Sequence, residues 1–190
     1  MQYLRASGLT GTKEGCASGD CGACTVMVGE LKAGQVQFKT INSCIVPIGQ
    51  LAGTHVVTVE GLADQSGLHP VQDEMVVCHG SQCGFCTPGF VMSLAAMLEN
   101  GDPAKTETVQ QGISGNLCRC TGYRPIVQAG MNALGRDYES RLQDPGLLND
   151  IKPALFGSVQ QPINESALRE AMLQYPQASL IAGGTDLMLE

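Results

Sequence analysis

Tryptophan is absent from the 190-residue chain, and aromatic residues make up only 4% of it. Basic residues are also scarce: 11 Lys and Arg against 18 Asp and Glu give a formal net charge of −7, which excludes a phosphate-tracking nucleic-acid surface. No apolar run reaches the ~18 residues of a membrane span, so no membrane association is expected. The first residues, MQYLRASGLTGTKEG, lack the apolar centre of a signal peptide, and we therefore expect a cytoplasmic protein.

Cysteine and glycine, by contrast, are abundant, with nine and 24 residues. In a reducing cytosol, clustered thiols are more often metal ligands or catalytic groups than disulfide partners. The cysteine count is odd, so a framework that paired every thiol would leave one over. These considerations favour metal sites.

The first cysteine set follows the pattern C-x4-C-x2-C in GCASGDCGACTV, with a fourth cysteine in a separate segment. Its members are Cys16, Cys21, Cys24 and Cys44. This is the plant-type ferredoxin spacing for a [2Fe–2S] cluster. Three thiolates from one loop must converge on a small cluster, and the interspersed glycines allow the left-handed turns that this requires. Buried cysteines without a ligand, or a zinc knuckle, are the alternatives.

The second set has the pattern C-x2-C…C-x-C and comprises Cys83, Cys86, Cys118 and Cys120. A zinc ribbon prefers two C-x2-C pairs, and a thioredoxin-like motif needs a nearby βαβ pattern, so both match poorly. Each pair instead precedes a predicted helix. A helix N-terminus carries partial positive charge, which stabilises thiolates and an anionic cluster.

The hydrophobic pattern predicts strands and helices around these loops. Strands are expected at residues 24–30, 34–38 and 54–62. Helices are expected at residues 69–80, 88–101, 105–114 (ending near Gly115) and 124–134. The second of these helices is expected to carry Val91, Leu94, Ala95 and Leu98 on one face.

Several residues that could carry chemistry have a structural interpretation. Cys78 is predicted inside a helix, away from both cysteine sets, as a core or surface thiol. His55, His69 and His79 are not needed as ligands, because each set already holds four cysteines. Tyr123 is predicted to pack against the second cysteine loop.

At this point the sequence resembles a known family. GSQCGFCTPGFVMS and GNLCRCTGYRPIVQA are similar to the iron–sulfur subunit of the molybdenum hydroxylases, which include xanthine dehydrogenases and aldehyde oxidoreductases. GLTGTKEGCASGDCGACTV and NSCIVPIGQLAGTHVVTVEGL resemble the first-cluster domain of that family. HGSQCGFCTPG, and the continuation of the chain beyond the second cluster domain, favour the xanthine dehydrogenase type.

The resemblance implies an α+β fold. It begins with a truncated β-grasp, ferredoxin-like [2Fe–2S] domain at residues 1–62, followed by an all-α, four-helix [2Fe–2S]-binding domain at residues 63–138. A linker at residues 139–160 leads to the start of an α+β FAD-binding domain at residues 161–190. Compared with the family, the N-terminal hairpin and most of the FAD domain are missing. A fragment of a longer gene product, with an exposed sheet edge, is therefore expected.

The C-terminal segment INESALREAMLQYPQASLIAGGTDLMLE looks like the start of the FAD domain. Asn164 is predicted to cap a helix that runs to about Tyr175, followed by a strand, a Gly-Gly turn and a new helix. Backbone amides at such a turn can bind a pyrophosphate. By resemblance, the residues that contact FAD are Leu180, Ile181, Ala182, Gly183, Gly184, Thr185, Asp186 and Leu187.

The resemblance also implies a function, an electron relay without catalytic residues of its own. Electrons leave a molybdopterin centre on a large partner subunit and pass through the second-set cluster and then the first-set cluster to FAD. NAD+ or oxygen is the final acceptor, and a dimer of heteromers is implied. Gln82 and Cys120 match positions near the pterin.

Other functions remain open from the residues alone. The same relay could serve an enzyme that oxidises an aldehyde, carbon monoxide or an N-heterocycle instead of a purine. A zinc-stabilised binding module without catalytic activity and a free-standing ferredoxin belong to different classes. The C-x-C pair counts against the zinc module, and the FAD-like segment counts against the ferredoxin.

Overall fold

The computed structural model describes residues 1–65, 67–149 and 162–180. Its strands are β1 (Thr25–Lys32), β2 (Gln35–Asn42) and β3 (His55–Val57). Its α-helices are α1 (Gln2–Ala6), α2 (Pro70–Val77), α3 (Thr87–Glu99), α4 (Thr106–Gly112), α5 (Arg124–Leu134), α6 (Gly146–Asn149) and α7 (Glu165–Gln174). The 3₁₀ turns are η1 (Ile48–Leu51), η2 (Val59–Gly61) and η3 (Arg141–Gln143). Within the described ranges, no helix combines the length and apolar character needed to cross a bilayer.

The three strands form one antiparallel sheet in the order β2-β1-β3. Strands β1 and β2 make a hairpin in which Thr25 faces Asn42 and Lys32 faces Gln35. The two turn residues, Ala33 and Gly34, both have positive φ (51° and 80°). Such a turn matches the twist of the strands and fixes their register. The hairpin therefore determines which residues at the far end of β1 and β2 lie side by side.

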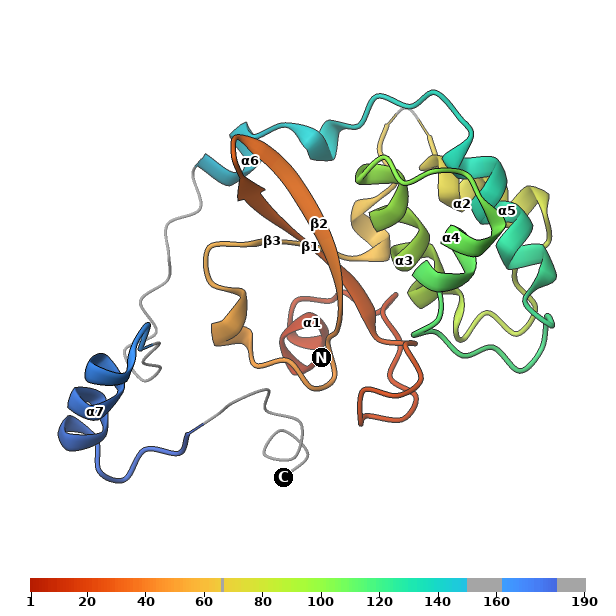
Figure 1. The fold of residues 1–190 in the computed structure, drawn as a ribbon. Coiled ribbons are helices and arrows are strands. Elements are labelled where there is room, and N and C mark those ends of the chain that lie inside the picture. Colours follow the sequence, from red (N-terminus) through yellow and green to blue (C-terminus); the bar gives the residue numbers. More distant parts are fainter. Residues whose placement is uncertain (66, 150–161, 181–190) are drawn as a thin grey trace.

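Helix α3 lies at the centre of the helical part and also contacts β1 and β2. Figure 1 shows it beside α2, α4 and α5, on one side of the hairpin. Of the four residues predicted to share one face of this helix, Val91, Leu94 and Ala95 are buried, and the burial extends beyond that face. Residues from Gly89 to Met97 are all buried, whereas Leu98 is only partly covered. A helix covered on most sides is expected to be largely apolar, and of the buried residues of α3 only Ser93 and Glu99 carry polar side chains.

The sheet and the helices share one continuous apolar core. Met27 and Phe38 from the sheet belong to the same buried cluster as Phe90 and Leu94 of α3 and Ile126 of α5. A small antiparallel sheet combined with helices confirms the predicted α+β class at this level.

Most predicted elements form, with differences at their ends. Helix α5 spans the residues predicted for it. The strand predicted at residues 54–62 is wrong beyond Val57, because the chain turns into η2 there and the Gln72 side chain binds the Val59 carbonyl at 3.1 Å. Helix α4 ends at Gly112, earlier than predicted, and Cys78 is the C-cap of α2 and does not lie inside the helix.

Helix α7 begins where the sequence predicts. The Asn164 side chain accepts the Ala167 amide at 2.9 Å and so caps the helix. Tyr175 follows as the C-cap. The strand, turn and helix predicted after it fall almost wholly on residues 181–190, outside the described residues.

Candidate metal centres

The first cysteine set begins in the loop before β1, where the backbone curls around one sulfur atom. Cys16 Sγ accepts the amides of Ser18 at 3.4 Å and of Asp20 and Cys21 at 3.3 Å each. Gly19, with a φ of +83°, provides a left-handed turn that other residues adopt only with strain. Hydrogen bonds from Ser18, and then from Cys21, lower the pKa of Cys16 to about 6. The loop thus favours a thiolate at this position.

Cys16 and Cys21 form one pair of this set, because the amide of each donates to the sulfur of the other, at 3.4 and 3.3 Å. The other pair is Cys24 and Cys44, whose sulfur atoms lie 3.3 Å apart. Cys24 directly precedes β1 and Cys44 follows β2, so the pairing of Thr25 with Asn42 brings them together. Cys24 is 1% exposed, and burial raises its pKa to about 12. Such a thiol loses its proton when its sulfur binds a metal ion, because the ion's charge replaces that of the proton.

The second set lies at the N-terminal ends of α3 and α5. Cys86 is the N-cap of α3, and Cys118 and Cys120 precede α5. Burial, followed by a hydrogen bond with Cys118, raises the pKa of Cys86 to about 12. A hydrogen bond with Cys83 raises the pKa of Cys120. The four thiols therefore also form two pairs, Cys86 with Cys118 and Cys83 with Cys120.

Tyr123 holds the second loop in place, as predicted from the sequence. Its hydroxyl oxygen accepts the Cys118 amide at 2.9 Å, and its ring packs edge-to-face on Phe90 with centroids 6.0 Å apart. Burial acts to raise the pKa of Cys118, but hydrogen bonds from Thr121 outweigh it and lower the pKa. This loop, like the first, directs donors at a cysteine sulfur.

The two cysteine loops contact each other directly. The Leu117 amide, one residue before Cys118, donates to the Cys21 carbonyl at 2.9 Å. The ring of Phe85, from the loop of Cys83 and Cys86, lies against Gly15: a Cβ on Gly15 would be 3.4 Å from it. The two cysteine sets thus belong to one contiguous region of the structure.

The pairing of the thiols indicates what kind of centre they fit. Among the described residues, no three His, Cys, Asp or Glu side chains surround a single metal-ion position. A tetrahedral zinc site would gather four ligands around one ion. A [2Fe–2S] cluster has two irons and four cysteine ligands, and so takes two thiolates at each iron. Two pairs of thiols in each set fit the two-iron centre.

Comparisons with known proteins agree with this geometry. The family described as "2Fe-2S iron-sulfur cluster binding domain" matches residues 1–49, which hold the first set. The family described as "[2Fe-2S] binding domain" matches residues 58–131, which hold the second. Xanthine dehydrogenase from Oryza sativa subsp. japonica is 52% identical over 133 residues, covering 68% of this chain and 10% of the relative. Aldehyde oxidase 4 from Cavia porcellus is 46% identical over 148 residues, covering 76% of this chain and 11% of the relative.

Among solved structures, quinoline 2-oxidoreductase from Pseudomonas putida 86 aligns with a TM-score of 0.61 and 39% identity, covering 70% of this chain and 78% of that one. The chain belongs to the molybdenum hydroxylase family. It carries two 2Fe–2S binding domains of that family and spans about a tenth of the length of the curated relatives it matches. These relatives are oxidoreductases, which confirms at the family level the predicted oxidoreductase component.

The predicted cofactor contacts outside the cysteine sets are placed only in part. Gln82 is exposed, directly before Cys83. Leu180 is 64% exposed at the end of a described range. The remaining predicted FAD contacts lie outside the described residues. They are Ile181, Ala182, Gly183, Gly184, Thr185, Asp186 and Leu187.

His69, a structural residue by prediction, caps α2 and is 2% exposed. Its Nδ1 accepts the Val71 amide at 3.3 Å, and its Nε2 lies 3.3 Å from Glu99 Oε1. Because Nδ1 is an acceptor here, the ring proton is on Nε2 and is donated to the carboxylate. Both ring nitrogens of His69 thus have hydrogen-bond partners inside the protein, and the ring is buried, which confirms the structural role of His69.

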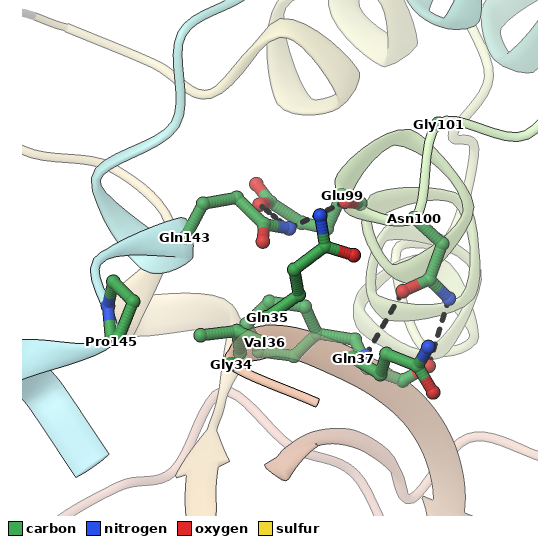
Figure 2. A pocket seen from close by; sticks show the side chains of 10 residues that line it. Gly34, Gln35, Val36, Gln37, Glu99, Asn100, Gly101, Gln143 and Pro145 are labelled. Atoms are coloured by element: carbon green, nitrogen blue, oxygen red, sulfur yellow. Dashed lines mark hydrogen bonds between the residues drawn. The ribbon is translucent and has the colours of Figure 1, made fainter. Parts of the chain in front are cut away.

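A cavity of about 680 Å³ lies between β2, the end of α3 and the segment after η3, away from the cysteines. Figure 2 shows the Asn100 side chain reaching β2, where it accepts the Phe38 amide at 2.9 Å and donates to the Phe38 carbonyl at 2.8 Å. On another side, Gln143 binds the Glu99 backbone carbonyl, and the Ser140 hydroxyl donates to Glu99 Oε1 at 2.7 Å. The sequence did not single out these residues. The cavity joins structural segments and contains no cysteine in its lining.

Proposed function

We propose that the chain relays electrons within a molybdenum hydroxylase, through two [2Fe–2S] clusters held by its eight paired cysteines. The observation that carries this proposal is the arrangement of each set as two close pairs of thiols. In the first cluster, Cys16 and Cys21 would hold one iron and Cys24 and Cys44 the other. In the second cluster, Cys83 and Cys120 would hold one iron and Cys86 and Cys118 the other.

The protein's own contribution is to place and stabilise the thiolates. When bound, each [2Fe–2S] cluster takes up and releases one electron. Amides directed at Cys16 and Cys118 stabilise negative charge on sulfur, and such hydrogen bonds tune the reduction potential. Burial of Cys24 keeps water away from one side of its cluster. The chain supplies no acid, base or nucleophile in this proposal.

The order of the relay follows from the resemblance. Cys83, Cys120 and the adjacent Gln82 are exposed, so a molybdopterin-bearing large subunit can approach the second cluster, as the resemblance implies. The first cluster then passes electrons to FAD. The capped helix α7 is consistent with residues 161–190 as the start of an FAD-binding domain, preceded by domains at 1–62 and 63–138 and a linker at 139–160.

For the whole enzyme we propose purine hydroxylation of the xanthine dehydrogenase type, with NAD+ as the final acceptor, in the cytoplasm, as a dimer of heteromers. The similarity to xanthine dehydrogenases from several organisms supports this choice. Aldehyde oxidation is the second candidate, because aldehyde oxidases match over the same part of the chain at similar identity.

The first experiment is to purify the chain anaerobically, count iron and acid-labile sulfide, and record EPR spectra after reduction. We expect about four irons and two distinct cluster signals. Cys44→Ala should lose the first signal and Cys118→Ala the second, each with about half of the iron. The matched control is Cys78→Ala, which should keep both signals. Folded protein that contains zinc and no iron would overturn the proposal.

A further inference from the structure

Where the two iron–sulfur domains meet, backbone touches backbone. Gly22 lies between Cys21 and Cys24, and Gly89 lies in the first turn of α3, just after Cys86. A Cβ on Gly89 would be 2.1 Å from the Gly22 carbonyl oxygen, so no side chain fits between the two segments. The first cysteine loop therefore rests directly on the helix that follows the second C-x2-C pair.

One buried side chain, that of Asn116, fixes this contact. Asn116 is 3% exposed and lies two residues before Cys118. Its Nδ2 donates to the Gly22 carbonyl at 2.9 Å and to Thr25 Oγ1 at 3.1 Å, and its Oδ1 accepts the Ser93 hydroxyl at 2.6 Å. The amide thus joins three segments: the first cysteine loop, helix α3 and the second cysteine loop.

The position of Asn116 also determines the next contact along the chain. The amide of Leu117 donates to the Cys21 carbonyl at 2.9 Å. This hydrogen bond links a cysteine of the first set to the residue that precedes Cys118 of the second. If the Asn116 side chain lost its hold on Gly22, the Cys21 carbonyl and the Leu117 amide would no longer be held in register.

We propose that Asn116 is a positioning residue that fixes the separation of the two clusters and so sets the coupling between them. This inference rests on the proposed function, because it requires both clusters to be present. The residue does not touch the thiols; it acts through Gly22 and through the hydrogen bond between Leu117 and Cys21. Its effect on electron transfer is therefore geometric.

The test replaces the amide by a carboxylate in Asn116→Asp. The carboxylate has almost the same shape and can still accept the Ser93 hydroxyl, but it cannot donate to Gly22. The matched control is Asn100→Asp, since the Asn100 amide joins the same two domains at the far end of α3 and contacts neither cysteine loop. Both variants are made in the intact chain and purified with their clusters.

The readouts are iron content, the EPR interaction between the two reduced clusters, and the two midpoint potentials. We expect Asn116→Asp to retain both clusters but to weaken their magnetic interaction and shift at least one potential, and Asn100→Asp to leave both readouts unchanged. An unchanged interaction in Asn116→Asp would overturn the inference. Equal changes in both variants would also overturn it, because general loosening of the domain contact would then explain them.

A second variant keeps the inference testable if Asn116→Asp does not fold. Ser93→Ala removes the hydroxyl that holds Asn116 Oδ1, so the amide that donates to Gly22 is held less firmly. It should weaken the interaction in the same direction but less, and a wild-type interaction in this variant would count against the role of Asn116. Absence of two clusters from the wild-type protein would instead refute the proposed function, so the two failures can be told apart.

Discussion

Gly89 is the residue at which the contact between the two domains can be tested most directly. A Cβ there would lie 2.1 Å from the Gly22 carbonyl oxygen and 3.1 Å from its carbonyl carbon. Since both belong to backbone, Gly89→Ala must push the two segments apart. We expect the free energy of unfolding to fall by about 1–3 kcal/mol, the usual range for overpacking. Chemical denaturation followed by far-UV circular dichroism measures this.

The control for this substitution is Gly135→Ala. Gly135 is the C-cap of α5 and has a negative φ of −84°, and the nearest atoms to an added Cβ are 3.5 Å away. An alanine fits there, so the free energy of unfolding should change by less than about 1 kcal/mol. Equal losses in the two variants would show that the Gly22–Gly89 contact has no special cost.

At the residue scale, the sequence identifies the cysteines but not the side chains that arrange them. The spacing of Cys16, Cys21 and Cys24 is a local pattern imposed by one cluster, so it can be recognised without a structure. Asn116 and Asn100 have no such pattern. Their partners, Gly22 and Phe38, are far away along the chain, and only the fold shows that these amides join two domains.

Among the elements, β3 offers a test of pH dependence through His55. Burial, followed by the charge of Arg141, lowers the pKa of His55 below its ordinary value of 6.5. The unfolded chain then binds more protons than the folded one, so stability rises with pH. The contribution is complete above about pH 6.5 and is lost as pH falls through the folded-state pKa. We expect urea unfolding to show decreasing stability below that pH.

His55→Leu isolates this contribution. The variant should show a smaller loss of unfolding free energy on acidification than the wild type, and Arg141→Met should show a partial reduction, because it removes only the charge effect. Comparing the unfolding free energies of the variants at each pH separates the contribution of His55 from pH effects that all of the variants share. An identical pH slope in His55→Leu and in the wild type would contradict the assignment.

Element prediction succeeded where the signal is local and failed where packing decides. Helix α5 has Pro125 in its first turn and an amphipathic pattern, and its ends were predicted correctly. The pattern of α3 suggested one apolar face, but the sheet covers one side of it and the other helices cover the rest. β3 is short because it pairs only with Met27, Val28 and Gly29 of β1. The burial of α3 and the length of β3 depend on neighbouring segments that the local sequence does not reveal.

For the molecule as a whole, the shared core predicts cooperative unfolding. Met27 and Phe38 of the sheet are buried in the same cluster as residues of α3 and α5. We expect the loss of far-UV dichroism and the loss of cluster absorbance to coincide in thermal melts, since neither domain buries its apolar surface without the other. Two well-separated transitions would contradict this expectation and favour independent domains.

The family was recognisable from the sequence because its motifs span both cysteine sets. The division at residues 62 and 63 remains a prediction, and the structure shows why sequence alone cannot settle it: the core is continuous across that point. The predicted FAD contacts also remain predictions, because all of them except Leu180 lie outside the described residues.

The backbone contact between Gly22 and Gly89 has a consequence for how such a sequence can evolve. A Cβ on Gly89 would collide with the Gly22 carbonyl oxygen, and a Cβ on Gly22 would lie 2.2 Å from the Gly115 carbonyl oxygen, so neither position can change by single steps without cost. A lineage that gained a side chain at position 89 would first have to rebuild the loop around position 22. Both sites should therefore stay glycine while exposed positions in the same loops vary freely.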